Sequence, residues 1–157
     1  MNRYVIALGS SDYLAFDYLD KALKLMNNQN ILIIKAKSSF YKNCSLNTKQ
    51  KLVFLNCCLA VTSYLPSLML YKEVKAIEKK LCKITPYKNA PRSIDIDILF
   101  SLEHSYNDNY FTIPHSQLLY RDFFILPTKE VLKKANWPIF TKFYYNLHHR
   151  KQILEII

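Results

Sequence analysis

The sequence predicts an α+β fold, a ferredoxin-like three-layer α-β-α sandwich with a mostly antiparallel central sheet. Strand-like and helix-like segments follow one another in the order β-α-β twice, with further strand-like runs around them. Half of the 157 residues are apolar, which is enough to build one hydrophobic core. No linker, repeat or low-complexity stretch divides the chain, so we expect residues 1–157 to form a single domain.

The first half of the chain alternates between apolar runs and one amphipathic segment. The expected elements are a buried strand over residues 3–9, a helix from about 12 to 26, a strand over 31–41, a polar loop over 43–51 and a central strand over 52–64. Asp12 is a typical helix-capping residue, and Leu14, Tyr18 and Ala22 follow it at helical spacing. The run over 52–64 is rich in β-branched and aromatic residues, which favours a strand.

The second half begins with an amphipathic helix and ends with another. The expected elements are a helix over residues 67–81, a basic loop over 82–91, a strand ending at Phe100, a polar turn region over 101–110, a segment dense in functional side chains over 111–127 and a closing helix over 137–154. Pro66 and Ser67 suit the start of the first helix, and Leu70, Val74 and Ile77 form its apolar stripe.

The charge and the glycine content limit the ways in which this protein can bind an anion. The formal net charge is +10, which indicates an anionic partner but does not separate nucleic acid from a nucleotide. Gly9 is the only glycine in the chain. A phosphate-binding loop of the Walker or GxGxxG kind needs several glycines, so both are excluded. Any phosphate must therefore be held by side chains and metal ions.

Cysteine spacing and hydropathy point to a cytoplasmic protein. The four cysteines form no CxxC pair, so reduced thiols are a better interpretation than zinc ligands or disulfides. No apolar run approaches the roughly 18–20 residues of a membrane span, and the first apolar stretch is too short for a secretion signal. We expect a cytoplasmic monomer without a membrane partner.

Two aspartates interrupt the apolar stretch "APRSIDIDILF". Asp95 and Asp97 are two residues apart, so on a strand they share one face with Cα atoms about 6.5–7 Å apart. Ile94, Ile96 and Ile98 then line the opposite face. Such a pair can bridge two Mg²⁺ ions in phosphoryl transfer, but solvated strand faces carry the same pattern more often. Neighbouring segments have to decide between these interpretations.

Other segments supply groups suited to phosphate and to a flat ring. His115 and Arg121 in "IPHSQLLYRDF" can both donate to phosphate, although a lone histidine is more often structural. The aromatic and amide groups around "SSFYKNCSLN" and "FLN" suit a flat heterocycle, although Phe54 alone would be assigned to the core.

Five short motifs appear in a fixed order. They are "ALGSS" at 7–11, "SSFY" at 38–41, "FLN" at 54–56, "PRSIDIDIL" at 91–99 and "PHSQLLYRDFFILP" at 114–127. On these motifs, from Tyr4 to about Val131, the chain resembles the 6-hydroxymethyl-7,8-dihydropterin pyrophosphokinase family of folate biosynthesis. The resemblance implies transfer of the β,γ-pyrophosphoryl group of ATP to the hydroxymethyl oxygen of the pterin, with release of AMP.

The resemblance also implies a role for each matching residue. The catalytic residues would be Arg92, Asp95, Asp97, His115 and Arg121, with Asp95 and Asp97 holding two Mg²⁺ ions between ATP and pterin. ATP would contact Lys75, Lys83, Lys88, Arg92, Ile98, His115 and Arg121. The dihydropterin would contact Asn43, Leu46, Phe54, Asn56, Asp95 and Phe123, the two phenylalanines stacking on either side of its ring. The general base stays open between Asp97 and a metal-bound water.

The chain departs from the family pattern at Ser11, in the basic loop, and at residues 43–45, where a Thr-Pro pair is common after the SxxY motif. Ser11 replaces an asparagine that forms a turn, which is a tolerated exchange. In the basic loop, Lys83 and Lys88 stand where arginines are common and Asn89 where tryptophan is common. Lysine lacks the bidentate fork of arginine, so the resemblance implies a differently shaped phosphate clamp there.

Two other functions remain as alternatives. A ferredoxin-like RNA-binding module would explain the charge and the twelve tyrosines, but the glycine-containing RNA-binding motif is absent and two strand carboxylates would repel a phosphate backbone. A catalytically inactive relative is the second alternative. The retention of all the expected polar catalytic residues argues against it. No nucleic-acid partner is therefore expected.

Overall fold

The structure is a computed structural model that describes residues 1–28, 30–44, 52–82, 92–138 and 155–157. Within these ranges the main sheet has the strand order β5-β1-β4-β3-β8, and β2 also pairs with β4. The strands are β1 (Asn2–Ser10), β2 (Ile33–Lys37), β3 (Tyr41–Cys44), β4 (Val53–Ser63), β5 (Asp95–Ser101) and β8 (Glu155–Ile156). Each described pairing in the sheet is antiparallel, as the sequence predicts.

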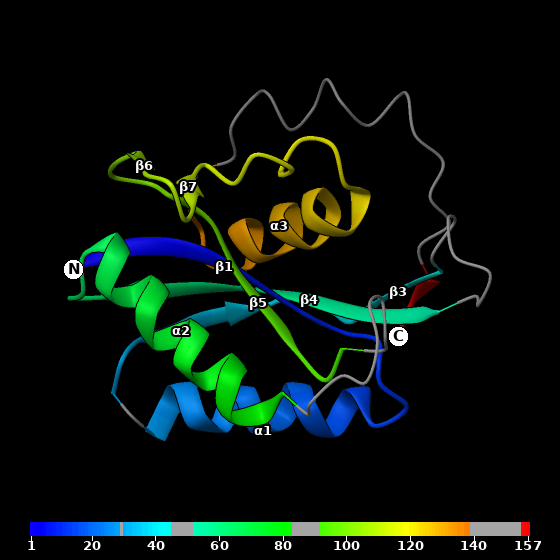
Figure 1. The fold of residues 1–157 in the computed structure, drawn as a ribbon. Helices are drawn as coiled ribbons and strands as arrows, with labels where there is room; N and C mark the ends of the chain where they lie inside the picture. The colour runs from blue at the N-terminus through cyan, green and yellow to red at the C-terminus, as the bar shows by residue number, and fades with distance from the viewer. Residues whose placement is uncertain (29, 45–51, 83–91, 139–154) are drawn as a thin grey trace.

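Helices cover both faces of this sheet, which confirms the three-layer α-β-α prediction. α1 (Ala15–Asn28) and α2 (Ser67–Leu81) lie side by side on one face, and α3 (Asp122–Lys134) lies on the other (Figure 1). The short strands β6 (Tyr106–Asn107) and β7 (Thr112–Ile113) form a separate hairpin. None of the helices in the described ranges is long and apolar enough to cross a membrane.

The central strands explain why their sequences are apolar on both sides. β1 pairs with β4 from Asn2 opposite Ser63 to Ser10 opposite Leu55. In β4, every residue from Leu55 to Ser63 is buried, because helices cover both faces of the strand. The continuous apolar run that predicted a central strand is the consequence of this double coverage.

The helix bounds agree with the sequence patterns for α2 and differ by a few residues for α1. α2 spans Ser67–Leu81, as expected, and buries the stripe of Leu70, Val74 and Ile77. α1 begins at Ala15 rather than near Asp12. Asp12 still prepares the turn, since its Oδ1 accepts a hydrogen bond from the Leu14 amide at 3.0 Å.

The expected single strand over residues 31–41 is wrong, because the structure divides it. β2 ends at Lys37 and β3 starts at Tyr41, extending through Asn43 and Cys44 into the expected loop. The break lies at Ser38, whose hydroxyl accepts a hydrogen bond from the Cys58 amide at 2.9 Å. A side chain thus replaces a backbone group of the ladder, and the strand resumes in a new position.

α3 corrects the interpretation of the C-terminal third. The sequence analysis expected no helix over residues 122–134 and a helix over 137–154 instead. The structure forms α3 over Asp122–Lys134, with Pro127 inside it. Trp137 and Pro138 lie in no helix, and residues 139–154 lie outside the described ranges.

Candidate active site

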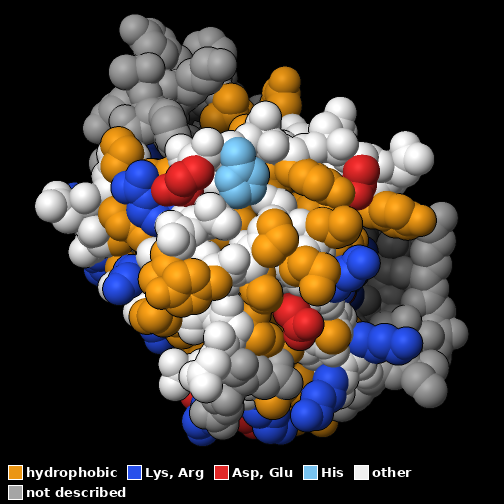
Figure 2. Space-filling model, turned by 90° about the vertical axis from the view of Figure 1, so that its left-hand side faces the viewer, with side chains coloured by type: hydrophobic (Ala, Val, Ile, Leu, Met, Phe, Trp, Pro, Cys, Tyr) orange, Lys and Arg blue, Asp and Glu red, His pale blue; other side chains and the backbone are white. Residues whose placement is uncertain are grey.

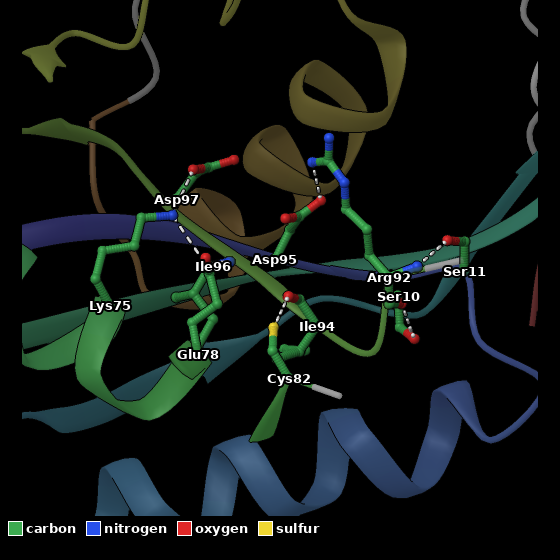
Figure 3. Close-up of polar contacts among 10 residues, drawn as sticks. All are labelled: Ser10, Ser11, Lys75, Glu78, Cys82, Arg92, Ile94, Asp95, Ile96 and Asp97. Atoms are coloured by element: carbon green, nitrogen blue, oxygen red, sulfur yellow. Dashed lines mark hydrogen bonds and ion pairs between the residues drawn. The ribbon is translucent and has the colours of Figure 1, made fainter. Parts of the chain in front are cut away.

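Asp95 and Asp97 lie at the start of β5, the edge strand of the sheet. Residues 95–98 alternate between half-buried and buried, so both carboxylates share one face while Ile96 and Ile98 are buried on the other. About one third of each carboxylate side chain is exposed, 36% for Asp95 and 33% for Asp97. Figure 3 shows both pointing to the same side of the strand, which confirms the predicted geometry.

Arg92 forms an ion pair with the first of these carboxylates. Its Nη1 atom lies 2.8 Å from Oδ2 of Asp95, and this bond raises the pKa of Arg92 above its ordinary value. The arginine backbone is tied to the end of β1: its amide donates to the Ser11 hydroxyl at 2.9 Å, and its carbonyl accepts from the Ser11 amide at 3.0 Å (Figure 3). The serine that departs from the family pattern thus holds Arg92 in place.

Lys75 of α2 reaches the second carboxylate around the sheet edge. Its Nζ atom lies 3.4 Å from Oδ1 of Asp97 and 2.8 Å from Oε2 of Glu78. Burial alone would lower the pKa of Lys75, but Asp97 and Glu78 outweigh burial and raise it, so the ammonium stays charged. Lys75 is therefore a cation fixed beside the aspartate pair.

Sequence analysis did not identify Glu78 as part of this site. The carboxylate accepts the Ile96 amide at 2.8 Å as well as the Lys75 ammonium, so it anchors the β5 backbone between the two aspartates (Figure 3). The only signal in the sequence was the three-residue spacing from Lys75, which places both side chains on one helix face.

His115 approaches the same group from the segment before α3. Its amide donates to the Leu99 carbonyl of β5 at 2.7 Å, and its Nδ1 accepts from the Gln117 amide at 3.1 Å. A neutral ring in this state carries its proton on Nε2. Burial lowers the pKa of His115, Arg121 and Lys75 lower it further, and Asp97 opposes them. The pKa of His115 therefore depends on Asp97 of the carboxylate pair and on the basic side chains of Arg121 and Lys75.

Arg121 occupies the N-cap position of α3 beside two aromatic rings. Its Cζ atom lies 5.5 Å from the ring centre of Phe123 and 5.6 Å from that of Phe124. The edge of His115 also meets Phe124, with ring centres 5.3 Å apart. These contacts gather two cationic or proton-donating groups at the start of α3.

An amide pair lies across the sheet from the carboxylates. Nδ2 of Asn56 donates to Oδ1 of Asn43 at 2.6 Å, and both residues are buried. In the strand register, Asn56 is opposite Gly9, and Gly9 is opposite Asp95. Cross-strand partners point to the same face, so the amide and the carboxylate lie in one row with only a glycine between them.

Gly9 keeps this row clear. A Cβ atom at this position would lie 2.7 Å from Oδ1 of Asn56, closer than real Cβ contacts allow. Gly9 is also partly accessible to solvent, although it lies on a central strand next to the fully buried Leu8. The single glycine of the chain is therefore needed to leave room on the sheet between Asn56 and Asp95.

The two expected stacking rings come from different layers. Phe54 is half-buried on β4, two residues before Asn56 and therefore on the same face. Phe123 is half-buried on α3, and its ring meets Phe124 edge-on at 4.8 Å between centres. The sheet face that carries Phe54 is the one that α3 covers, since Cys58 of that face contacts Thr128 of α3.

Of the four remaining predicted residues, three lie outside the described ranges and one points away from the carboxylates. Leu46, Lys83 and Lys88 lie outside the described residues. Ile98 is 4% exposed and points to the face of β5 opposite Asp97, so only its backbone could reach a nucleotide bound beside the carboxylates. Among the described residues, no three His, Cys, Asp or Glu side chains gather as a metal site, so within these ranges the aspartate pair is the candidate for holding a metal ion.

Positive charge is dispersed on the surface that Figure 2 shows. Among the coloured residues of that face, Lys and Arg side chains form separate small groups between hydrophobic and acidic ones. Nucleic-acid binding uses a continuous basic patch or stripe, and this face has none among its described residues. The net charge of +10 is therefore not concentrated there for a polyanion.

The fold and the site together define an α+β protein with a carboxylate pair and neighbouring basic side chains on the sheet beside an amide pair. Comparison with known proteins agrees with this class, since residues 5–133 match the 7,8-dihydro-6-hydroxymethylpterin-pyrophosphokinase (HPPK) family. The match spans most of the chain, and the chain belongs to this family.

Named relatives give the same result. The chain is 33% identical to 2-amino-4-hydroxy-6-hydroxymethyldihydropteridine pyrophosphokinase of Aquifex aeolicus over 143 residues, covering 90% of this chain and 88% of that protein. It is 29% identical to the enzyme of the same name from Haemophilus influenzae, covering 80% of this chain and 79% of the other. The resemblance stated from the motifs is confirmed.

Longer relatives contain this unit as one part. The chain is 30% identical to the mitochondrial folate synthesis bifunctional protein of Pisum sativum, covering 83% of this chain but 25% of that protein. A crystal structure of HPPK-DHPS in complex with substrates aligns with a TM-score of 0.64 at 16% identity, covering 85% of this chain and 40% of the other. This last likeness supports the fold prediction alone.

Proposed function

We propose that this chain transfers the β,γ-pyrophosphoryl group of ATP to 6-hydroxymethyl-7,8-dihydropterin, giving AMP and the dihydropterin diphosphate, a step of tetrahydrofolate biosynthesis. Its family makes it an ATP-dependent pyrophosphokinase, a diphosphotransferase. The observation that carries the proposal is the row on one sheet face, where the Asp95 carboxylate, paired with Arg92, is separated from a buried amide pair by one glycine.

The cations around the aspartates form the ATP side of the site. Lys75 and Arg92 pair with Asp97 and Asp95, and the charges of Asp97, Arg121 and Lys75 all act on His115. A triphosphate must lose charge before a nucleophile can approach phosphorus, and fixed cations supply this without reorganisation. We assign phosphate binding to Lys75, Arg92, His115 and Arg121, to the backbone of Ile98, and to Lys83 and Lys88 from the sequence alone.

The carboxylate pair fits Mg²⁺ by its chemistry. Asp95 and Asp97 offer hard oxygen ligands from one strand face and are one-third exposed, which suits an ion that keeps waters and phosphate oxygens as its other ligands. We propose that they hold two ions. When bound, Mg²⁺ would neutralise triphosphate charge and acidify the pterin hydroxyl. Arg92 and Lys75 are the side chains that keep the carboxylates oriented.

The amide row forms the pterin side. Strand spacing places Asn56 and Asp95 about 9–10 Å apart at their Cα atoms, since each of the two steps across the sheet is about 4.8 Å. A pterin lying over Gly9 would present its ring edge to Asn43 and Asn56 and its hydroxymethyl group to Asp95. Phe54 from the sheet and Phe123 from α3 would stack on its two faces. Leu46 is assigned to the same side from the sequence alone.

The proposed transfer is a nucleophilic displacement at the β-phosphorus of ATP. The pterin hydroxyl oxygen forms a bond to this phosphorus while the bond to the oxygen of the α-phosphate breaks, and AMP leaves with that oxygen. The hydroxyl proton goes to Asp97 or to water. His115, with its proton on Nε2, donates a hydrogen bond to a phosphate oxygen during the displacement.

The setting of the reaction is also part of the proposal. We propose that residues 1–157 act as one catalytic domain and as a monomer. The four cysteines are all free thiols, and burial raises the pKa of Cys57 to about 12. Free thiols, two of them exposed, suit a reducing compartment, and the cytoplasm is the location that we propose.

The direct test is product analysis. Purified protein is mixed with ATP, Mg²⁺ and 6-hydroxymethyl-7,8-dihydropterin, and the nucleotides are separated by chromatography. AMP and pterin diphosphate should appear in equal amounts, and neither should appear when the metal is chelated. Formation of ADP would contradict pyrophosphoryl transfer. Calorimetry with single-stranded RNA in place of the substrates should show no binding, whereas tight binding would favour the RNA-binding alternative.

A further inference from the structure

A second carboxylate centre lies on α3, away from the aspartate pair. Oε1 of Glu130 accepts hydrogen bonds from the Ser39 amide and hydroxyl, each at 2.9 Å, and from Nζ of Lys134 at 2.6 Å. Its Oε2 accepts from the Tyr41 hydroxyl at 2.8 Å. Glu130 thus joins α3 to Ser39, between β2 and β3, and to Tyr41, the first residue of β3, through three donors.

The protonation states support this connection. Burial alone would raise the pKa of Glu130, but the hydrogen bonds from Lys134, Ser39 and Tyr41 outweigh burial and hold the pKa below its ordinary value. Burial and the Glu130 charge both raise the pKa of Tyr41, so its phenol stays protonated and donates. At neutral pH the bond therefore joins a carboxylate acceptor to a neutral donor.

Glu130 and Tyr41 lie on the same helix and the same strand as residues that we assign to pterin binding. Phe123 precedes Glu130 by seven residues, which is two helical turns, so both lie on one stripe of α3 about 10 Å apart along the axis. Tyr41 precedes Asn43 by two residues on β3 and is opposite Asn56 in the register. The hydrogen bond between Tyr41 and Glu130 therefore connects the side of α3 that carries Phe123 to the strand that carries Asn43.

The helix itself holds Phe123 weakly. Pro127 has no amide hydrogen, so the Phe123 carbonyl lacks the usual donor four residues later. Besides Glu130, α3 is joined to the sheet by Nζ of Lys134, which donates to the Lys37 carbonyl of β2 at 3.2 Å, by the contact between Thr128 and Cys58, 3.7 Å from Oγ1 to Sγ, and by its buried apolar side chains. Among the described residues, Glu130 accepts four hydrogen bonds, three of them from Ser39 and Tyr41, so it is the most extensively hydrogen-bonded contact between α3 and this part of the sheet.

We infer that Glu130 is a positioning residue for the pterin side of the site, fixing the separation between Phe123 on α3 and the Asn43–Asn56 amide pair on the sheet. This inference rests on the proposed function. Glu130 touches no substrate in this arrangement. It acts through Ser39 and Tyr41, and its loss changes the spacing that a flat ring between helix and sheet requires.

The chain offers a matched control in Glu103. This carboxylate accepts the Arg3 amide at 2.7 Å, the Arg3 Nε at 2.6 Å and the Ser101 hydroxyl at 3.3 Å. It lies at the other end of the sheet, since Ser101 is opposite Tyr4 whereas Asp95 is opposite Gly9. A Glu103→Gln variant therefore removes a similar hydrogen-bond centre without touching the pterin side.

The test is steady-state kinetics of Glu130→Gln, Tyr41→Phe and Glu103→Gln, varying the pterin and ATP separately. Glu130→Gln should raise the pterin KM on the order of tenfold, the scale on which supporting residues act, with kcat and the ATP KM within about twofold of wild type. Tyr41→Phe should shift the pterin KM in the same direction, and the double variant should be less than additive. Glu103→Gln should change neither KM.

The following outcomes would contradict the role of Glu130 or the proposed function. Equal losses of thermal stability in Glu130→Gln and Glu103→Gln, with an unchanged pterin KM, would assign Glu130 to stability alone and overturn the inference. If Glu130→Gln fails to fold, an unchanged pterin KM in Tyr41→Phe would overturn it as well. A wild-type protein that releases no AMP would overturn the proposed function and this inference together, whereas active wild type with unchanged variants would overturn only the inference.

Discussion

At the two ends of β5, carboxylates are held in opposite ways. Just beyond the strand's C-terminal end, Glu103 accepts three hydrogen bonds, two of them from Arg3 at 2.7 and 2.6 Å. At the N-terminal end, Asp95 has one described partner, Arg92, and Asp97 has one long contact of 3.4 Å to Lys75. All three side chains are about one-third exposed, so exposure does not separate them.

The difference is in the number of acceptor positions left open. A carboxylate has about four, and a group with a structural or positioning role fills most of them from the protein. Glu103 and Glu130 do so, whereas Asp95 and Asp97 keep most of theirs available among the described residues. Open acceptors beside fixed cations are what a metal–phosphate complex needs.

The largest effect is expected when the charge of Asp95 or Asp97 is removed. Asp95→Asn and Asp97→Asn keep the shape of each side chain but remove its charge. Each should lower pyrophosphoryl transfer at least about 100-fold, as loss of a group that stabilises transition-state charge does. The free energy of unfolding should change by less than about 1 kcal/mol, because exposed ion pairs contribute little. AMP release and urea denaturation measure the two effects, and near wild-type transfer in either variant would refute the assignment.

A second test extends the comparison to the aromatic rings. Phe123→Ala removes one proposed stacking face and should weaken pterin binding by about 1–3 kcal/mol, by analogy with base–aromatic stacking. ATP binding without pterin should stay the same. Phe16→Ala is a suitable control, because Phe16 is also a helical ring, more exposed than the half-buried Phe123, and lies on α1 on the other side of the sheet. Fluorescence titration measures the affinities. Unfolding at lower denaturant without a selective binding loss would place Phe123 in the core.

Substitution of Glu103, whose acceptor positions are mostly filled, should change the stability of the protein instead of its activity. Glu103→Gln should lower the free energy of unfolding by about 1–2 kcal/mol at pH 7, because donors from Arg3 lose a charged acceptor. Burial raises the pKa of Glu103, but the bonds from Arg3 outweigh it and hold the pKa below its ordinary value.

The sign of the pH dependence follows from this depressed pKa. The stabilisation by Glu103 is present above the pKa of the unfolded chain and is lost as the pH falls through the folded pKa. The difference in unfolding free energy between wild type and Glu103→Gln should therefore shrink on acidification. A difference that grows as the pH falls would contradict the proposed role.

The smallest expected effect is the uptake of less than one proton by His115 when ATP binds. Its pKa is lowered in the free protein by burial and by Arg121 and Lys75. A bound triphosphate adds negative charge and should raise this pKa, so ATP binding should take up protons and tighten as the pH falls through the interval between the two values. Calorimetry in buffers of different ionisation enthalpy measures the uptake. His115→Asn should abolish it, and equal uptake in that variant would assign it to another group.

The sequence predicted those elements whose pattern depends on burial alone. β4 and α2 appear almost where expected, because an apolar run covered on both faces and a helical stripe are properties of the local sequence. The aspartate pair was predictable for the same reason, since a two-residue period fixes its face. The division at Ser38 and the helix around Pro127 were missed, because each depends on a partner from another segment or on tertiary packing that tolerates a proline.

The carboxylates Glu78 and Glu130 were missed for a different reason. On an amphipathic helix, a glutamate looks like part of a solvated face, and nothing nearby in the sequence shows what it will meet. Glu78 meets the Ile96 amide and Glu130 meets Tyr41, 18 and 89 residues away in the chain. These contacts exist only after the sheet has formed.

The hydrogen bonds along β5 have a consequence for solubility. β5 is an edge strand, and the free backbone groups of an edge can recruit strands from other molecules. Here Glu78 covers the Ile96 amide, the Cys82 thiol lies 3.5 Å from the Ile94 carbonyl and the His115 amide meets the Leu99 carbonyl. The groups that build the reaction site thus also block intermolecular strand pairing, and losing them would expose this edge to aggregation.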